Sequence, residues 1–553
     1  MDTSILTGKL VDILQQLVYP ARIKIVNGRI ADIERIAEPG NVADLPFILP
    51  GFIDAHVHIE SSMLTPSQFA RLATVHGTVA TVSDPHEIAN VCGETGVLFM
   101  IEDGKSVPFK FYFGAPSCVP ATNFETAGNA LDAGAVKRLL EMKEIYYLSE
   151  MMNFPGVLNG DPVVLQKIKA AHELGKPVDG HAPGLKGELA KKYIDAGIST
   201  DHECFTAEEA LDKLRFGMKI IIREGSAAKN FDALIPLLRD YPDQMMFCSD
   251  DKHPDSLVAG HINQLCSRAI KKGIPLFHVL RAACVNPVLH YKLDVGLLRP
   301  NDPADLILVK DMENFEVIQT YVNGALVAEK GISKIDAAAV STLNNFRRGS
   351  ITLSDLQLKS NVENILMPVI VALDGQLITN KILVAPKIEN GFAVSDPEHD
   401  ILKIGVVNRY ADAPVALGFI RNFGFKTGAI ASSVAHDSHN VIAVGADDES
   451  LLRAINLVIE TKGGVSCVSS QTELVLGLPI AGLMSTDDGY KVASAYTTID
   501  QMAKSLGSKL SAPFMTLSFM ALLVIPHLKL SDKGMFDGDK FEIIQKSKVK
   551  NQK

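Results

Sequence analysis

Apolar and polar positions alternate in two short stretches that lie far apart in the chain. The first, ARIKIVNGRIADIERI, contains the pair Asn27-Gly28, and the second, ADLILVKDMENFEVIQTYVNGALVAEKG, contains Asn323-Gly324. An Asn-Gly pair between two alternating runs is a strong signal for a β-hairpin. Because these two pieces flank a long middle segment, they predict one small β domain built from both flanks, with another domain inserted into it.

The middle segment alternates short apolar runs with segments of helical period such as PVVLQKIKAAHELG. The apolar runs are GTVATVSDP, KFYFGAPSC, IYYLSEMMN, PVDGHAPG, MKIIIREGS and MMFCSDDKHP. Alternation of strands and helices predicts a parallel sheet. The length of the segment, about 240 residues, is typical of a (β/α)8 barrel of the TIM type, whose active-site residues lie at the carboxyl ends of the strands.

The remainder of the chain contains strand-like runs such as KIGVVNRYAD and NVIAVGAD and a predicted helix from about Asp448 to Thr461. It therefore reads as a separate α+β domain. The predicted fold is α/β, with a composite β domain (1–50 and 288–340), a metal-dependent (β/α)8 barrel (51–287) and a C-terminal α+β domain (341–553).

Two histidines, His56 and His58, end the first buried run of the barrel segment. The preceding residues, FILPGFIDA, are apolar apart from the break at Pro50-Gly51, which indicates a turn that leads into a buried strand. Residues two apart on a strand point to the same face, so both imidazoles can reach one point. Buried polar groups without partners are costly. A divalent metal would satisfy both rings; the alternative is a pair of hydrogen-bonded core histidines.

Polar residues also follow five later strands. They are Asp84, His86 and Glu87; Glu150; His181; His202 and Glu203; and Asp250, Asp251 and His253. Each group alone could be a turn residue, a satisfied core group or a helix cap. Together, four histidines, one glutamate and one aspartate would converge on a single barrel mouth.

Imidazole and carboxylate ligands suit Zn, Mn or Fe. Two ions side by side need a bridging anion, and the two oxygens of Glu150 can supply it. A water between the two ions would be partly deprotonated near neutral pH and would be a hydroxide nucleophile. A carboxylate must then accept its proton and pass it to the leaving group, and Asp250 fits that role.

Composition limits the class of protein. The chain has 553 residues, of which 47% are hydrophobic and 21% charged, as in globular proteins with a large core. The net charge of -10 argues against a nucleic-acid partner. Seven cysteines without a C-x-x-C pair fit a reducing cytoplasm. The N-terminus lacks the layout of a signal peptide, and the apolar run from Phe514 to Pro526 is shorter than the roughly 20 residues that span a bilayer. We expect a cytoplasmic protein that binds neither membranes nor nucleic acid.

The string PGFIDAHVHIESS resembles the start of the amidohydrolase superfamily of metal-dependent barrel hydrolases. The strings SDPHEIANVCG, SEMMNFPGV, GHAPG, STDHE and SDDKHP resemble the bacterial adenine deaminase family in particular, and the resemblance extends to SSVAHDSHN near the C-terminus. It implies a binuclear centre of Mn2+ or Fe2+, with Zn2+ as a further possibility. It also implies attack of a metal-bridged hydroxide on C6 of adenine, which gives hypoxanthine and ammonia. Many superfamily members use a carboxylated lysine as the bridge, but Glu150 stands at that strand end here.

The resemblance also implies individual roles. By position, His56 and His58 bind the first metal with Asp250, His181 and His202 bind the second, and Glu150 bridges them. Asp251 is the alternative to Asp250. The acid that protonates the purine ring is Glu203, Glu87 or His86; Glu203 could instead support His202. Asp84, His86 and Glu87 are candidates for contact with the purine edge, where paired donors and acceptors distinguish adenine from other bases.

Two other functions remain open at this stage: a cyclic-amide hydrolase of the hydantoinase or dihydroorotase type on the same barrel, and a metal-free barrel that serves as a binding scaffold. The chain lacks the H-x-E and P-C-x-x-C strings of the nucleic-acid deaminases, so base flipping is not expected. His436, Asp437 and His439 could hold a further ion, form a wall of the active site or belong to a polar loop that closes on the barrel. A homodimer is the expected assembly.

Overall fold

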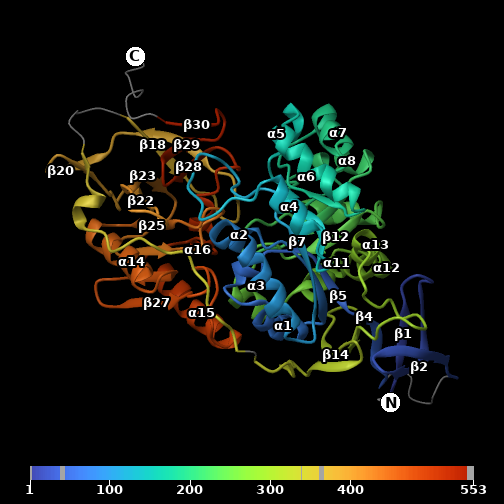
Figure 1. Ribbon diagram of the computed structural model, residues 1–553. Coiled ribbons are helices and arrows are strands. Elements are labelled where there is room, and N and C mark those ends of the chain that lie inside the picture. The colour runs from blue at the N-terminus through green and yellow to red at the C-terminus, as the bar shows by residue number, and fades with distance from the viewer. Residues whose placement is uncertain (1–2, 38–43, 338, 360–365, 545–553) are drawn as a thin grey trace.

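Eight parallel strands form a barrel at the centre of the computed structural model, which describes residues 3–37, 44–337, 339–359 and 366–544 of the chain (Figure 1). They are β5 (Phe52–Val57), β6 (Thr78–Ser83), β7 (Lys110–Ala115), β8 (Ile145–Met151), β9 (Val178–Gly180), β10 (Thr200–Asp201), β11 (Lys219–Arg223) and β12 (Met245–Cys248). Strands β5 to β9 pair in order, as do β10 to β12.

Two backbone contacts join these two sets of strands into a closed ring. Ser199, just before β10, donates its N–H to the carbonyl of Val178 in β9 at 2.9 Å. On the other side, Asp250 donates its N–H to the carbonyl of His56 at 3.0 Å, within a parallel bridge between Val57 and Asp250. The barrel predicted from strand–helix alternation is therefore confirmed.

Helices follow the barrel strands and cover them from outside. In chain order they are η2 (Ile59–Ser62), α1 (Pro66–Thr74), α2 (His86–Cys92), α3 (Glu94–Lys105), α4 (Ala133–Leu140), α5 (Phe154–Asn159), α6 (Pro162–Glu173), α7 (Gly187–Asp195), α8 (Ala207–Arg215), α9 (Phe231–Leu234), η3 (Ile235–Arg239), α10 (Pro254–Ala259), α11 (Ile262–Lys271), α12 (Leu276–Leu280), η4 (Arg281–Val285) and α13 (Asn286–Tyr291). Every residue of β5, β6 and β12 is buried, since such strands have side chains facing both the barrel interior and the helices.

One eight-stranded sheet contains strands from both flanks of the barrel. Its strands are β1 (Thr3–Asp12), β2 (Leu17–Val26), β3 (Arg29–Arg35), β4 (Phe47–Pro50), β13 (Leu306–Val309), β14 (Val317–Val322), β15 (Ala325–Glu329) and β16 (Ile332–Ser333). Strand β4 lies between β1 and β13 and so joins the two flanks. Both predicted hairpins are confirmed, because β2 pairs with β3 and β14 pairs with β15 across the Asn-Gly turns.

The C-terminal region forms a second eight-stranded sheet in the order β19-β18-β23-β22-β25-β24-β26-β27. The strands of this region are β17 (Leu358–Lys359), β18 (Met367–Val371), β19 (Asn380–Val384), β20 (Lys387–Glu389), β21 (Phe392–Val394), β22 (Leu402–Val407), β23 (Ala416–Arg421), β24 (Ala429–Ser432), β25 (Val441–Gly445), β26 (Gly464–Val468), β27 (Glu473–Gly477), β28 (Leu528–Ser531), β29 (Gly534–Asp537) and β30 (Glu542–Ile543). The helices are η5 (Leu353–Leu356), α14 (Asp448–Glu460), α15 (Gly489–Ser505) and α16 (Pro513–Phe519).

Helices cover both faces of this sheet. On one face, α14 packs Leu451 and Ala454 against Ala429 and Ala443. On the other face, α15 and α16 lie between the sheet and the barrel (Figure 1). Helix α15 contacts α10 and α1 of the barrel, and the interface includes an ion pair between Arg71 Nη1 and Asp488 Oδ2 at 2.5 Å. The C-terminal region is thus fixed against the barrel.

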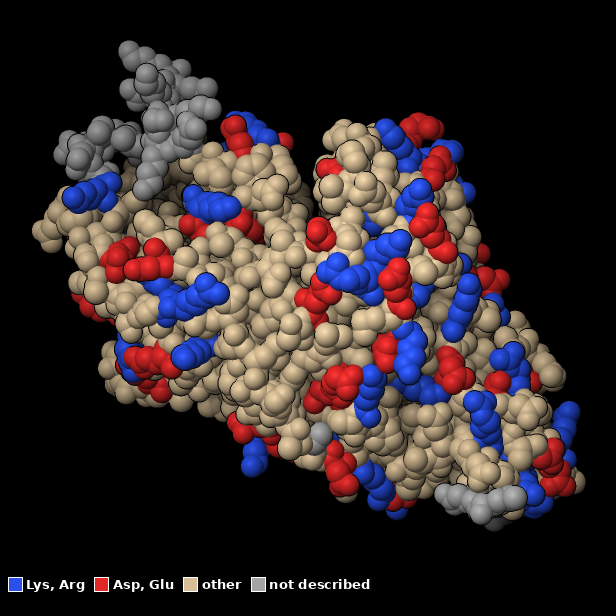
Figure 2. Space-filling view, in the orientation of Figure 1, with Lys and Arg blue, Asp and Glu red and all other residues tan. Residues whose placement is uncertain are grey.

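On the surface shown in Figure 2, acidic and basic side chains are intermixed, and neither kind forms a large patch. Among the described residues, no helix has both the length and the apolar character that crossing a bilayer requires.

Candidate metal centre and active site

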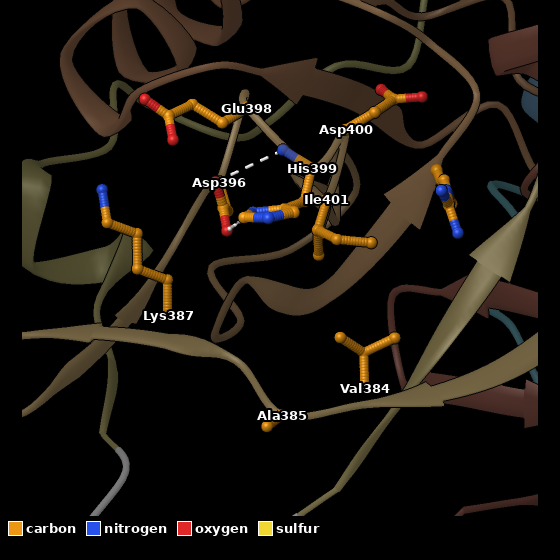
Figure 3. A pocket seen from close by; sticks show the side chains of 9 residues that line it. Val384, Ala385, Lys387, Asp396, Glu398, His399, Asp400 and Ile401 are labelled. Carbon is orange, nitrogen blue, oxygen red and sulfur yellow. Dashed lines mark hydrogen bonds and ion pairs between the residues drawn. The ribbon is translucent and has the colours of Figure 1, made fainter.

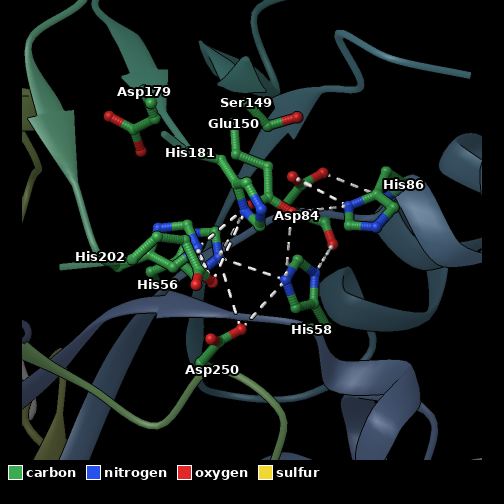
Figure 4. Close-up of polar contacts among 12 residues, drawn as sticks. His56, His58, Asp84, His86, Ser149, Glu150, Asp179, His181, His202 and Asp250 are labelled. Carbon is green, nitrogen blue, oxygen red and sulfur yellow. Dashed lines mark hydrogen bonds and ion pairs between the residues drawn. The ribbon is translucent and has the colours of Figure 1, made fainter. Parts of the chain in front are cut away.

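The predicted site residues come together at the carboxyl ends of the barrel strands (Figure 4). His56 lies in β5 and Glu150 in β8, whereas His58, His181 and His202 directly follow β5, β9 and β10. All five side chains are buried. The parallel strands of a barrel end at one edge, so residues distant in sequence meet there.

Glu150 is the centre of this cluster. Its Oε2 lies 2.8 Å from His181 Nδ1, 3.0 Å from His202 Nε2 and 4.0 Å from His56 Nε2. Its Oε1 lies 3.5 Å from His58 Nε2. One carboxylate therefore faces all four imidazoles, with its two oxygens directed at different members of the set.

Asp250 completes one side of the cluster. Its Oδ1 lies 3.2 Å from His58 Nε2 and 3.7 Å from His56 Nε2, and these two ring nitrogens are 3.2 Å apart. Metal–nitrogen bonds of about 2.0–2.1 Å place two ligands of one tetrahedral ion about 3.3 Å from each other. The spacing of these three atoms fits a shared divalent ion. The neighbouring Asp251 also lines the cavity, but its Oδ1 accepts a hydrogen bond from Ser61 Oγ at 2.6 Å and lies 3.5 Å from His436 Nε2.

The imidazole of His58 is oriented for metal binding by a second contact. Its Nδ1–H donates to the backbone carbonyl of Asp84 at 3.2 Å. A neutral ring protonated at Nδ1 keeps its lone pair on Nε2, which faces Glu150 and Asp250. Metal-binding histidines commonly hold their other ring nitrogen in this way.

The two acids of the cluster favour their ionised forms. Burial works to raise the pKa of Glu150, but His181 and His202 outweigh it and hold that pKa well below its ordinary value. Burial likewise opposes ionisation of Asp250, but the Arg223 guanidinium and the His58 contact lower its pKa well below the ordinary value. Carboxylates that remain ionised when buried suit the ligands of a divalent cation.

Arg223, which sequence reasoning missed, is the last residue of β11 and is fully buried. Its Nη1 donates to Asp250 Oδ2 at 2.6 Å and also to Glu203 Oε1, and its Nη2 donates to Glu203 Oε2 at 3.1 Å. The signal was present in the sequence, because a charged residue ends the apolar run KIII at the same strand position as the predicted ligands.

Glu203 lies behind two of the candidate ligands. Its Oε1 is 3.5 Å from His202 Nε2 and 3.6 Å from His181 Nδ1. Both of its oxygens also accept hydrogen bonds from Arg223. Glu203 is therefore a hydrogen-bond acceptor that faces the imidazoles of His181 and His202.

His86 lies at the edge of the cluster, between two groups of acids. Its Nδ1 is 3.1 Å from Asp84 Oδ2 and 3.4 Å from Glu150 Oε1. Its Nε2 is 3.4 Å from Glu87 Oε1 and 3.6 Å from Asp437 Oδ1. The string SDPHE thus borders the predicted metal centre, as expected, and also reaches the C-terminal region.

Residues of the C-terminal region form one wall of the site. His436 Nδ1 and His439 Nε2 each contact one oxygen of Glu87. Of the three interpretations open for this segment, both a wall of the active site and a polar loop that closes on the barrel describe its position. His253, by contrast, faces α15, where Tyr496 Oη lies within hydrogen-bond distance of its Nδ1 at 2.5 Å.

The cavity at the barrel mouth is small. It encloses about 20 Å³, and its lining includes Leu377, Leu522, His436 and Asp437 of the C-terminal region. That space suffices for about one water molecule, which needs roughly 10–15 Å³. A larger hollow of about 630 Å³ is lined by residues between 384 and 421, among them the paired Asp396 and His399 (Figure 3). It shares no lining residue with the cavity at the barrel mouth.

Two protein families match this chain. Residues 47–327 match the family described as "Amidohydrolase family", and residues 376–542 match the "Adenine deaminase C-terminal domain". The first match covers the barrel and the second covers most of the C-terminal sheet.

Similar proteins with the name "Adenine deaminase" span nearly the whole chain. The chain is 54% identical over 543 residues to that of Salinibacter ruber, covering 98% of each protein. It is 55% identical over 535 residues to that of Sulfurovum sp., covering 97% of this chain and 98% of the relative. With that of Borreliella burgdorferi it shares 50% identity over 549 residues, covering 98% and 99%.

Among solved structures, a beta-aspartyl dipeptidase from Fervidobacterium islandicum AW-1 is 18% identical to this chain with a TM-score of 0.46, covering 60% of the chain and 99% of that structure. An enamidase described as a member of the amidohydrolase superfamily is 17% identical with a TM-score of 0.45, covering 60% and 97%.

Proposed function

This chain belongs to the adenine deaminase family of the amidohydrolases, and we propose that the cluster at its barrel mouth carries out the hydrolysis of adenine to hypoxanthine and ammonia. One observation carries the site assignment: both oxygens of the buried Glu150 carboxylate face the four candidate imidazole ligands. A bridging carboxylate between two ions requires this arrangement.

In this proposal two metal ions bind per chain. His56, His58 and Asp250 would hold the first, His181 and His202 would hold the second, and Glu150 would contribute to both. We propose Mn2+ as the metal, with Fe2+ or Zn2+ as alternatives, because imidazole and carboxylate ligands suit all three. Two bound ions would supply activation of a water molecule as a nucleophile near neutral pH.

Asp250 is the proposed proton carrier. Adenine hydrolysis requires a base that takes a proton from water and an acid that delivers it to the departing amine. The Oδ1 of Asp250 faces the cluster, whereas its Oδ2 accepts from Arg223 at 2.6 Å. Arg223 therefore fixes the orientation of the carboxylate, so that a single oxygen is presented to the reacting atoms.

His86 is the best candidate for the acid that protonates the purine ring. Glu203 accepts hydrogen bonds from Arg223 at both oxygens, and Glu87 contacts imidazoles at both oxygens. Burial lowers the pKa of His86, but Asp84 and Glu87 outweigh burial and raise it well above the ordinary value. A protonated imidazole 3.4 Å from Glu150 can donate to a ring nitrogen bound above the cluster.

We assign contact with the purine edge to Asp84 and Glu87, which flank His86. The cavity of about 20 Å³ is smaller than the roughly 300 Å³ of ordinary small-molecule pockets, and we propose that adenine displaces part of the cavity lining when it enters. Leu377 and Leu522 of the C-terminal region belong to this lining, so we propose that they move on substrate entry.

We further propose a cytoplasmic homodimer that acts in purine salvage or in adenine catabolism. All seven cysteines are free in the structure, which fits a reducing compartment. Size-exclusion chromatography with light scattering measures the assembly, and a monomer at micromolar concentration would contradict that part of the proposal.

The site assignment is tested with three variants. We expect His56→Ala and His181→Ala to lower ammonia release from adenine by at least about 100-fold, because each removes a metal ligand. Glu150→Gln should lose at least one metal equivalent by elemental analysis. His290→Gln, a half-buried histidine of α13 that bonds Ser199 outside the cluster, is the matched control and should keep both metals. Undiminished turnover in His56→Ala or His181→Ala would contradict the assignment.

Two further measurements address the alternative functions. Dihydroorotate and hydantoin are assayed alongside adenine, and turnover of these cyclic amides without ammonia release from adenine would favour a cyclic-amide hydrolase. Protein produced with manganese supplementation is analysed for bound metal, and absence of any transition ion together with absence of turnover would favour a scaffold.

A further inference from the structure

Two histidines of the C-terminal region hold a carboxylate of the barrel. His436 Nδ1 contacts Glu87 Oε1 and His439 Nε2 contacts Glu87 Oε2, although more than 340 residues separate them in sequence. All three side chains are buried. The barrel supplies Glu87 and the neighbouring His86, whereas the C-terminal region supplies the two shortest contacts to the carboxylate.

The donor role of His439 follows from its other ring nitrogen. The backbone N–H of Ala435 donates to His439 Nδ1 at 3.2 Å, so Nδ1 carries a lone pair. In the neutral ring the proton is therefore on Nε2, which donates to Glu87 Oε2. A local turn of the C-terminal loop thus fixes both the tautomer and the direction of this hydrogen bond.

His436 lies between two carboxylates. Its Nδ1 contacts Glu87, and its Nε2 is 3.5 Å from Asp251 Oδ1. Burial lowers the pKa of His436, but Glu87 and Asp251 outweigh burial and raise it to about 9. The ring packs against Phe519 of α16 with centroids 5.4 Å apart, so its position is set by the C-terminal core.

The loop that carries both histidines, residues 434–440, is held at several points. Tyr410 Oη donates to the carbonyl of Ser438 at 2.5 Å, and Arg409 Nη1 donates to the carbonyl of His439 at 3.3 Å. Asn440 Nδ2 donates to the carbonyl of Thr126, in the loop after β7 of the barrel, at 2.9 Å. A loop anchored to both regions can hold Glu87 at a fixed place.

We propose that His439 and His436 are positioning residues for the deamination reaction, which act by fixing the Glu87 carboxylate as a hydrogen-bond acceptor at the purine edge. This inference rests on the proposed function, in which Glu87 contacts adenine. A carboxylate oxygen has two acceptor sites, so Oε2, which contacts His439, can still accept a hydrogen bond from the substrate amino group or a ring N–H. The C-terminal region then forms part of the active site and contributes to the recognition of adenine.

The first test compares variants of His439. Loss of a hydrogen bond to a buried charged group corresponds to about a 10- to 100-fold effect. We therefore expect His439→Ala to lower kcat/KM for adenine by about that factor, mainly through KM, with two metal ions still bound. His439→Gln keeps an N–H donor of similar reach and should recover part of the loss. Wild-type kcat/KM in His439→Ala, or loss of metal from it, would overturn the positioning role.

The control is Asp488→Asn, which weakens the ion pair with Arg71 at the same interface without touching Glu87. Asparagine also caps a helix N-terminus, so α15 should remain intact. This variant should keep kcat/KM within about twofold of wild type. An effect as large as that of His439→Ala would show that any change at the interface impairs the enzyme, and would refute a specific role of His439.

A double-variant cycle separates this inference from the proposed function. If His439 acts only through Glu87, then adding His439→Ala to Glu87→Gln should reduce kcat/KM little further. Fully additive losses would refute the positioning role. Full activity in Glu87→Gln would instead remove Glu87 from the proposed function, whereas impaired Glu87→Gln with unimpaired His439→Ala would refute the present inference alone.

Discussion

At the scale of single residues, the buried guanidinium of Arg223 is the site residue that the sequence analysis did not single out. It pairs with Glu203 and Asp250, and burial of an unpaired charge is very costly. Burial lowers the pKa of Arg223, but the two acids outweigh it and raise that pKa further above its ordinary value. Arg223, Glu203 and Asp250 therefore form one buried ion-pair network next to the candidate metal centre.

Arg223→Met tests the contribution of this ion-pair network to stability. The variant leaves Glu203 and Asp250 without their cation, and removal of one partner from a buried ion pair costs about 3–5 kcal/mol. We expect a lower midpoint of chemical denaturation, measured with bound metal removed from both proteins. Arg22→Met breaks the exposed pair with Glu34 and should cost no more than about 1 kcal/mol. Equal midpoints for the two variants would contradict the assignment.

At the scale of elements, the two Asn-Gly turns show why the flanks form one sheet. Asn27 and Gly28 both have positive φ (49° and 77°), as do Asn323 and Gly324 (46° and 74°), which matches the turn type that suits the twist of a hairpin. Ala304 connects the two turns. Its N–H donates to the carbonyl of Gly28, and its carbonyl accepts a hydrogen bond from the N–H of Gly324.

Gly28→Ala tests that contact. A Cβ at Gly28 would lie 2.5 Å from the carbonyl oxygen of Asn323. Gly331, with φ of 76° and open space around its Cβ position, is the control, because alanine there meets only the conformational cost of about 1–2 kcal/mol. Gly28→Ala should cost a further 1–3 kcal/mol, roughly, from overpacking. The comparison is made by the midpoints of chemical denaturation, and equal losses would show that the two turns do not constrain each other.

At the scale of the whole molecule, the candidate metal centre joins strands on opposite sides of the barrel. Its ligands come from β5, β8, β9, β10 and the end of β12. Bound ions would link these strands and also satisfy a cluster of buried imidazoles and carboxylates. Ligands that bind only the folded state stabilise it, by about 2.7 kcal/mol at a hundredfold excess over Kd.

Removal of metal should therefore destabilise the protein as a whole. We expect treatment with a chelator to lower the midpoint of thermal unfolding and re-addition of Mn2+ to restore it, measured by scanning calorimetry. Glu150→Gln, which lacks the proposed bridge, should respond less to both treatments. If chelation removes all bound metal and leaves the midpoint unchanged, then the ions contribute nothing to stability and the proposed link between strands is wrong.

The sequence by itself determined the elements and the kinds of ligand. Short periodicities decide strands and helices, Asn-Gly pairs decide the two hairpins, and His56 and His58 share a face because strand side chains repeat every two residues. The order of strands in a barrel then places residues such as Glu150 and His202 at one edge. Strands, helices and hairpins depend on residues that are close in the chain. The meeting of the strand ends depends only on the barrel topology, for which the strand–helix alternation leaves few alternatives.

Only the tertiary structure decided which groups face one another. Asp250 and Asp251 are adjacent and chemically identical, yet Asp250, at a positive φ of 53°, faces His58 while Asp251 faces Ser61. The contact of Glu87 with His436 crosses from the barrel to the C-terminal region. Such contacts depend on the local direction of the backbone and on how distant segments pack against each other. The pattern of apolar and polar residues along the chain predicts neither of these.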